Sequence, residues 1–185
     1  MDELTPEFRA MVGKLLSACE EEGIFMEPYL GRLDPIEQAK LWCQARTVRQ
    51  VNQEIINLKS MGAHFLALCI ESAGEQGGPL ATSTIPGLSW HQWGEAIDCV
   101  WIVDGKEEWS DKNLVNGRNG YQIYGRKAAE LGLTSGACFS QKDWTHVQLR
   151  REQSPLNLYS LEEINDTMKE QYYHLLDVSS SLLLL

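Results

Sequence analysis

The chain is organised around the stretch Ser89-Trp90-His91-Gln92-Trp93-Gly94-Glu95-Ala96-Ile97-Asp98. It places a histidine and an aspartate seven positions apart, with Gly94 between them. A second pair follows near the end of the chain, where Asp143 stands three positions before His146. Two imidazoles and two carboxylates are enough for a catalytic zinc site that keeps one coordination position open. We expect the rest of the chain to build a pocket around these four side chains.

The spacing of His91 and Asp98 predicts a bend in the backbone between them. A straight strand would separate them by about 23 Å and turn them to opposite faces. A straight helix would still leave about 10 Å between them along its axis. Ligands of one ion must come within roughly 3 Å of each other, because zinc bonds are about 2 Å long. We therefore expect a bend at Gly94, which lacks a Cβ, with His91 on a loop and Asp98 in the strand that follows.

The composition is that of a globular protein. The 185 residues are 43% hydrophobic and 23% charged, which is ordinary for one domain with a sizeable core. The formal charge of -10 argues against a nucleic-acid partner, because phosphate binding needs a basic surface. No stretch reaches the length of a membrane span. We expect a monomer.

The five cysteines are scattered and form no CxxC pair, which predicts reduced, buried thiols and an intracellular protein. The N-terminus begins with acidic residues and lacks the apolar run of a secretory signal. These observations together predict that the protein accumulates in the cytoplasm.

Hydrophobic periodicity and turn residues predict the secondary structure. Helices are expected from Thr5 to Gly23, Pro35 to Trp42, Val48 to Met61, Ala63 to Ser72, Asn116 to Leu131 and Ser160 to Tyr173, and strands at Ile24–Leu30, Ile97–Val103, Lys106–Trp109, Leu133–Phe139 and Thr145–Leu149. This order predicts an α+β fold, in which a small, mainly antiparallel sheet is flanked by helices. We expect a single compact domain over residues 1–175 and a disordered tail over residues 176–185.

Two interpretations of the polar residues remain open from spacing alone. Asp98 interrupts an apolar strand, and a buried carboxylate needs a cation or hydrogen-bond donors to stay ionised. This favours a metal site of two histidines and one carboxylate, with Asp143 left as a base. In the other interpretation the histidines are structural, and Asp143 is a solvated loop residue beside Lys142.

The central stretch also resembles a known family. Ser89-x-His91-x-x-Gly94-x-Ala96-x-Asp98 matches every fixed position of the S-x-H-x-x-G-x-A-x-D motif of the zinc D-Ala-D-Ala carboxypeptidases and L-alanyl-D-glutamate endopeptidases. The family's second signature, an acidic residue three positions before a histidine, is met by the pair at 143 and 146. The resemblance extends from about residue 28 to residue 149, and is greatest to the endopeptidases that phages use as endolysins.

The resemblance implies a role for each residue of the motif. His91, Asp98 and His146 would bind Zn²⁺, and Asp143 would be the general base that takes a proton from the attacking water. The base is Asp where many members have Glu, which favours the endopeptidase branch. We expect the substrate contacts to come from Ser89, Gln38 and Trp144; for Trp144, packing under the site is the alternative.

The residue that corresponds to the family's arginine, which stabilises the oxyanion, is harder to assign than the metal ligands. Its usual position lies shortly before the Glu37-Gln38 pair, and here Arg32 lies one residue further upstream than the family pattern. A one-residue insertion in a loop is tolerable. Arg32 is therefore the expected residue, and Arg46 is the alternative.

The resemblance implies a zinc metallopeptidase, a hydrolase that cuts an amide bond in peptidoglycan stem peptides. Such a protein would act on the cell wall after release from the cytoplasm. Two alternatives remain: a non-catalytic cell-wall-binding module that retains the metal site, and a zinc hydrolase of another small amide.

Overall fold

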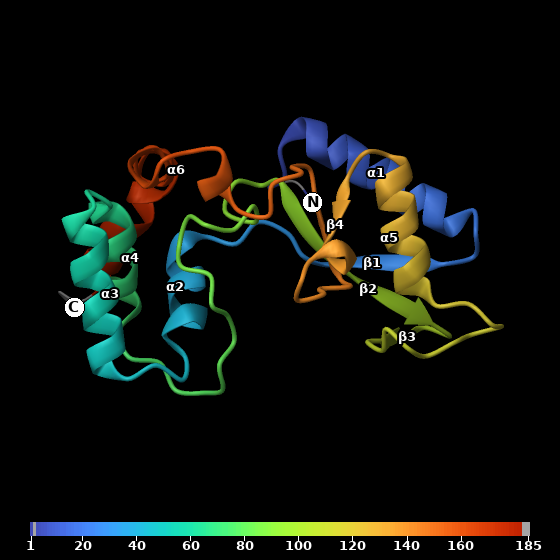
Figure 1. Cartoon of the computed structure of the whole chain (residues 1–185), viewed down its shortest axis with the longest axis horizontal. Coiled ribbons are helices and arrows are strands. Elements are labelled where there is room, and N and C mark those ends of the chain that lie inside the picture. Colours follow the sequence, from blue (N-terminus) through green and yellow to red (C-terminus); the bar gives the residue numbers. More distant parts are fainter. Residues whose placement is uncertain (2, 183–185) are drawn as a thin grey trace. The chain divides into compact units, whose positions relative to one another are not determined.

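The computed structural model describes residues 1 and 3–182 of the chain (Figure 1). It has an α+β fold with a five-stranded antiparallel sheet and flanking helices, which confirms the predicted class. Internal contacts divide the chain into two units, each made of two segments. The first unit contains residues 1–32 and 93–153, and the second contains residues 33–92 and 154–185. Of the expected tail, residues 183–185 lie outside the described residues, and the single domain over residues 1–175 stays a prediction.

The first unit carries the sheet and two helices. Its elements are α1 (Pro6–Glu20), β1 (Phe25–Leu30), β2 (Ala96–Val103), β3 (Lys106–Glu108), α5 (Gly120–Glu130), β4 (Thr134–Ser135), η1 (Gly136–Cys138) and β5 (His146–Gln148). The strands lie in the order β1-β2-β5-β4, and β3 pairs with the far end of β2. Helices α1 and α5 pack against each other and against β1 (Figure 1). Strand β2 is therefore the centre of this unit.

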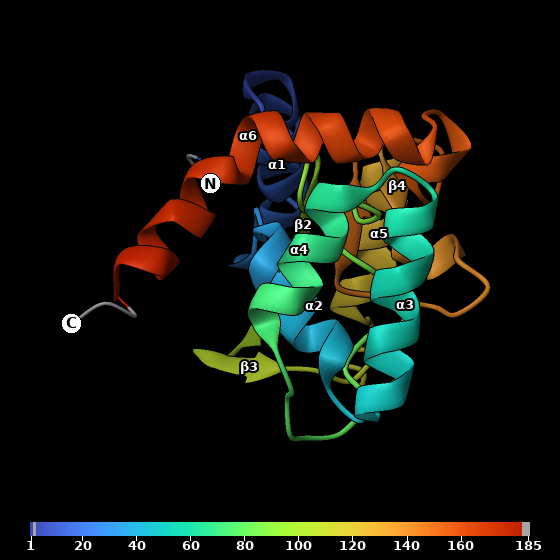
Figure 2. The same cartoon turned by 90° about the vertical axis from the view of Figure 1, so that its left-hand side faces the viewer.

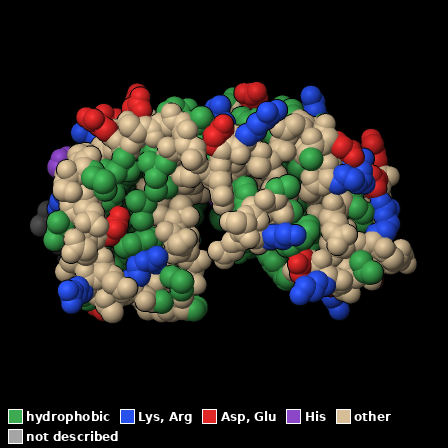
Figure 3. Space-filling model, in the orientation of Figure 1, with side chains coloured by type: hydrophobic (Ala, Val, Ile, Leu, Met, Phe, Trp, Pro, Cys, Tyr) green, Lys and Arg blue, Asp and Glu red, His purple; other side chains and the backbone are tan. Residues whose placement is uncertain are grey.

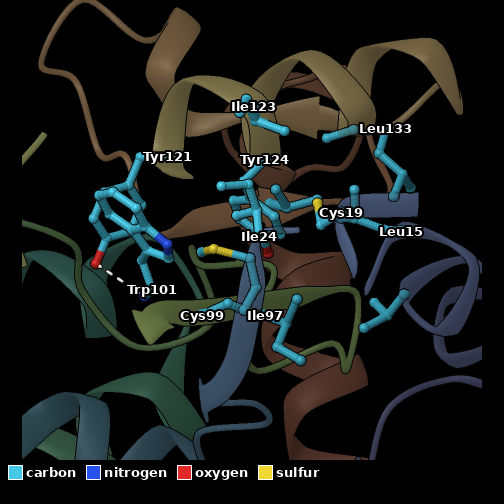
Figure 4. Packing of buried hydrophobic residues seen from close by; sticks show 14 of the residues in the cluster. Leu15, Cys19, Ile24, Ile97, Cys99, Trp101, Tyr121, Ile123, Tyr124 and Leu133 are labelled. Atoms are coloured by element: carbon cyan, nitrogen blue, oxygen red, sulfur yellow. Dashed lines mark hydrogen bonds between the residues drawn. The ribbon is translucent and has the colours of Figure 1, made fainter. Parts of the chain in front are cut away.

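The core of this unit fills the space between the sheet and the two helices. Ile97, Cys99 and Trp101 project from β2 into this core, which also contains the α5 side chains Tyr121 and Tyr124 (Figure 4). The Tyr121 hydroxyl accepts from the Trp101 amide at 3.4 Å and donates to the Glu108 carbonyl at 2.8 Å. Since side chains alternate along a strand, Asp98 points away from this core.

The second unit is helical. Its elements are α2 (Pro35–Cys43), α3 (Val48–Ser60), α4 (His64–Ala73), η2 (Pro155–Asn157) and α6 (Leu161–Leu182). The apolar helix α4 contacts α2, α3 and α6, and Figure 2 shows α6 crossing the end of the other three helices. Asn165 of α6 connects this helix to α4, because its side-chain oxygen accepts hydrogen bonds from the backbone amides of Phe65 and Leu66 at the start of α4.

Hydrophobic side chains also line a groove of about 520 Å³ over α3 and α4, seen as an apolar hollow in Figure 3. Arg46, Lys59 and Glu71 contribute charged groups to its wall. Of the residues expected in the zinc site, only the alternative arginine, Arg46, lines this groove. Among the described residues, no helix combines the length and hydrophobicity that a membrane span requires.

Several local predictions needed correction. Helix α5 starts at Gly120 rather than Asn116, because Asn116 and Gly117 both have positive φ and form a turn ahead of it. The expected strand Leu133–Phe139 is strand only at Thr134–Ser135 and then becomes the 3-10 turn η1. The last helix continues past Tyr173 to Leu182.

Side-chain contacts add detail at Thr5 and at the cysteines. Thr5 immediately precedes α1, but its hydroxyl makes no capping hydrogen bond; within the described residues it is buried without a hydrogen-bond partner. All five cysteines are free, but Cys138 is exposed, against the expectation that every thiol is buried. Burial raises the pKa of Cys69 and of Cys99 to about 12, so these two thiols are protonated and unreactive at neutral pH.

Candidate metal centre

Asp98 occupies the middle of the sheet in the first unit. It lies in β2, opposite His146 of β5 on one side and Leu30 of β1 on the other. The Cys99 amide donates to the Thr145 carbonyl at 3.0 Å and continues the ladder beyond that pair. Backbone pairing on both edges therefore fixes the position of the Asp98 carboxylate, as the predicted strand requires.

His146 is brought to Asp98 by this strand pairing. Its Nδ1 atom lies 3.1 Å from Asp98 Oδ1, and its Nε2 atom lies 3.0 Å from Gln148 Oε1. Burial, the largest influence, lowers the pKa of the imidazole, but the hydrogen bond and charge of Asp98 act in the opposite direction. Gln148 and the Asp143 charge add to this, and the net pKa of His146 lies above its usual value.

His91 lies on a turn ahead of β2, as predicted, and Gly94 supplies the bend. Gly94 has a φ of 68°, and a Cβ there would lie 3.0 Å from the Glu3 carbonyl oxygen. The Ser89 hydroxyl accepts from the His91 amide at 3.3 Å. Gln92 holds the same turn, because its side-chain oxygen accepts from the amides of Gly87 and Ser89. Ser89 therefore orients the turn that carries His91.

The side chains of His91, Asp98 and His146 form a group that could hold a metal ion. One ligand atom from each lies within 4.8 Å of the others, and both histidines are buried. The separation of 3.1 Å between His146 Nδ1 and Asp98 Oδ1 is close to the ~3.3 Å between two ligands of a tetrahedral zinc ion with bonds of about 2.0 Å. Two imidazole nitrogens and one carboxylate oxygen are also a donor set that suits a divalent transition metal. The residues therefore fit such an ion.

Asp143 is exposed, and its carboxylate is held by its own loop. Oδ1 accepts from the amide of Thr145 at 3.3 Å and from the Thr145 hydroxyl at 2.8 Å. Within residues 1 and 3–182 no hydrogen-bond donor reaches Oδ2. The charge of Asp143 contributes to the raised pKa of His146. Asp143 is thus beside the metal-binding group and has one oxygen left for a proton.

Gly136 allows the Asp143 loop to approach. The Asp143 amide donates to the Gly136 carbonyl at 3.0 Å. A Cβ built on Gly136 would lie 2.4 Å from the Asp143 carbonyl oxygen and 3.0 Å from the His146 Cβ. Only glycine fits at this position without displacing the loop.

The two candidate arginines differ in their surroundings. Arg32 is half-buried just after β1, two residues beyond Leu30, the strand partner of Asp98. The Arg46 guanidinium donates to the carbonyls of Trp42 and Thr82 and lies 4.2 Å from the centre of the Trp42 ring. Arg46 is thus committed to contacts in the helical unit, and the strand register favours Arg32 as the arginine near Asp98.

Gln38 and Trp144 have contacts of other kinds. Gln38 is buried, donates to the Thr84 carbonyl at 2.6 Å and accepts from Gln92 at 3.2 Å. It therefore supports the segment that leads to His91. Trp144 packs at the edge of the sheet core, with the Lys142 ammonium 5.2 Å from its ring centre. Substrate contacts by Gln38, Ser89 and Trp144 stay predictions.

Three residues at this site were missed by the sequence reasoning: Gly136, Gln148 and Glu95. The Glu95 carboxylate accepts from Arg150 Nε at 2.6 Å and Nη2 at 2.7 Å and so joins the start of β2 to the end of β5. Gln148 could have been found from its place two residues after His146 in a predicted strand, since such residues share a face. A glycine inside the predicted strand Leu133–Phe139 was also a signal of close backbone approach.

Comparison with known proteins adds no relative to this picture. No protein-family model matches the sequence, and no curated protein matches it closely enough to count as a relative.

Proposed function

We propose that this protein is a zinc-dependent peptidase that hydrolyses an amide bond in the stem peptides of peptidoglycan. The observation that carries the proposal is the convergence of His91, Asp98 and His146, whose ligand atoms lie within 4.8 Å of one another. Three protein ligands leave one position of a four-coordinate zinc ion for water or substrate, as in hydrolytic zinc sites. The substrate class rests on the motif resemblance around these residues.

The remaining residues supply the acid–base chemistry. A zinc ion, when bound, lowers the pKa of a water molecule and polarises a carbonyl group. Asp143 would take a proton from the attacking water through Oδ2, the oxygen without an internal donor, and then transfer it to the leaving amine. The Thr145 hydroxyl and amide hold the carboxylate in one orientation through Oδ1. Arg32 would stabilise the negative charge that develops on the carbonyl oxygen.

Asp143 gives the most direct test. We would measure metal content and murein hydrolysis on the same preparations of wild type and Asp143→Asn. Asp111→Asn is the control, because it removes an equal charge from an aspartate outside the metal group. We expect zinc in all three proteins, with hydrolysis reduced by about 10²- to 10⁴-fold only in Asp143→Asn, the usual contribution of a general base.

Other outcomes separate the alternatives. Bound zinc with murein binding but no hydrolysis in the wild type would favour a cell-wall-binding module. Bound zinc with hydrolysis of a free dipeptide, and none of murein, would favour a hydrolase of another small amide. A folded wild type that binds no divalent metal would refute the site itself.

The proposal includes the route to the substrate. The protein would act as a monomer on the wall after release from the cytoplasm, through a separate factor such as a phage holin. Expression in a bacterium without that factor should leave the cells intact until the membrane is opened. Rapid lysis on expression alone would contradict this route.

A further inference from the structure

Gln148 is a buried side chain in the central pair of strands, and its orientation is determined by its own hydrogen bonds. It is 1% exposed and lies between Ala96 of β2 and Thr134 of β4 in the strand register. Its Nε2 group donates to the carbonyl of Arg150 at 2.8 Å and to that of Glu152 at 2.7 Å. Carbonyl oxygens only accept. A flipped amide would place its oxygen against two other oxygens, so the nitrogen must face these carbonyls.

The orientation of the amide determines where His146 carries its hydrogen. With Nε2 of Gln148 committed to two carbonyls, the atom that faces His146 Nε2 at 3.0 Å is Oε1. An amide oxygen has no hydrogen to donate. His146 Nε2 must therefore be the donor and carry the hydrogen of the neutral ring. The other ring nitrogen, Nδ1, is the one that lies 3.1 Å from Asp98 Oδ1.

We propose that Gln148 is a positioning residue that holds His146 with its hydrogen on Nε2 and presents Nδ1 as the metal ligand. The inference rests on the proposed metal site, but the position of the hydrogen follows from the Gln148 contacts alone. Both residues lie on one face of β5, and Gln148 holds the ring through Nε2 while Nδ1 faces the Asp98 carboxylate. A histidine ligand whose second nitrogen is held in this way keeps one tautomer and one ring orientation.

A purely structural role for Gln148 makes a different prediction. Its two bonds to Arg150 and Glu152 close the chain segment after β5, and any loss of them would destabilise the protein whether or not His146 is affected. Asn119 offers a matched case in the same unit. It is also buried, and its amide nitrogen donates to the carbonyls of Ser110 at 3.1 Å and Asn113 at 2.8 Å.

The experiment compares wild type, Gln148→Leu and Asn119→Leu. Ring nitrogen NMR of ¹⁵N-labelled protein would locate the hydrogen of His146 with and without zinc, and chelator competition would give the zinc affinity. In the wild type we expect a hydrogen on Nε2 in both states and metal on Nδ1. Gln148→Leu should bind zinc about 10- to 100-fold more weakly, which is the usual effect of removing a side chain that hydrogen-bonds to a metal ligand. Asn119→Leu should keep wild-type zinc affinity and ring signals.

The outcomes separate this inference from the proposed function. Metal on Nε2, or an Nε2 without hydrogen in the metal-free wild type, would overturn the inference even if the enzyme is active. Equal zinc affinities of the two variants would also overturn it. A wild type that binds no zinc would refute the proposed function. If Gln148→Leu fails to fold, the metal-free wild type still tests the inference, because ring nitrogen NMR of that protein alone shows whether His146 Nε2 carries the hydrogen.

Discussion

Replacement of Gly136 by alanine should push the Asp143 loop out of place. The added Cβ would lie 2.4 Å from the Asp143 carbonyl oxygen, whereas ordinary contact begins at 3.4 Å. The difference requires a shift of about 1 Å in a segment that also carries His146, whose Cβ would be only 3.0 Å away. A displacement of that size at a catalytic group costs about 10²-fold in rate. Overpacking of this kind typically costs about 1–3 kcal/mol of stability.

The assay combines thermal unfolding, zinc affinity and murein hydrolysis. Gly13→Ala is the control, because nothing lies within 4 Å of the Cβ it would add in the middle of α1. That variant should be as stable as wild type or more so, since alanine is favoured over glycine in helices. Gly136→Ala should lower the unfolding temperature and weaken zinc binding or hydrolysis. Wild-type values in all three measurements would refute the claim that the Asp143 loop depends on a glycine at this position.

Two further predictions concern stability alone. Hydrogen bonding to Arg126, the largest cause, and to a neighbouring lysine lowers the pKa of Glu22 from 4.5 to about 2. The stabilising contribution of the Glu22 carboxylate is therefore present above pH 4.5 and is lost as the pH falls towards 2. Urea unfolding should show that Glu22→Gln loses less stability than wild type between these pH values. The same loss in both proteins would contradict the role of Glu22 in acid stability. Asn165→Ala should cost about 1–2 kcal/mol, because it leaves the amides of Phe65 and Leu66 at the start of α4 without their buried acceptor. Asp166→Ala removes only the acceptor of the Asn165 amide nitrogen and should unfold closer to wild type; equal losses in both variants would show that the α4 amides are not the cause.

The core of the candidate site was predictable because short-range rules apply to it. The distance between His91 and Asp98 demanded a bend, and Gly94 was the residue that permits one at least cost. The apolar run around Asp98 indicated a central strand, and an isolated carboxylate in such a strand needs a partner. The pairing of Asp98 with His146 in the strand ladder supplies that partner.

The support around the site was less predictable because it depends on long-range contacts. Gln38 and Gln92 are joined by a hydrogen bond across 54 positions of sequence, and no local pattern marks such a pair. The close approach at Gly136 depends on where the Asp143 loop returns to the sheet. The N-terminus of α4 has no capping side chain of its own. Its acceptor comes from Asn165, which the sequence shows only as one polar residue of a distant helix.

If the proposed function is right, the way in which each site residue is held should separate metal binding from turnover. Asp98 and His146 lie on paired strands, and Gln148 fixes the ring of His146 from the same sheet, so these ligands have little freedom before an ion binds. Asp143 is exposed on a loop, and within residues 1 and 3–182 its carboxylate is held by Thr145, two positions further along the chain. Strand positions restrict a side chain more tightly than an exposed loop does. Perturbations of the strands should therefore appear first as weaker metal binding, whereas perturbations of the 143–145 loop should reduce hydrolysis at full metal occupancy.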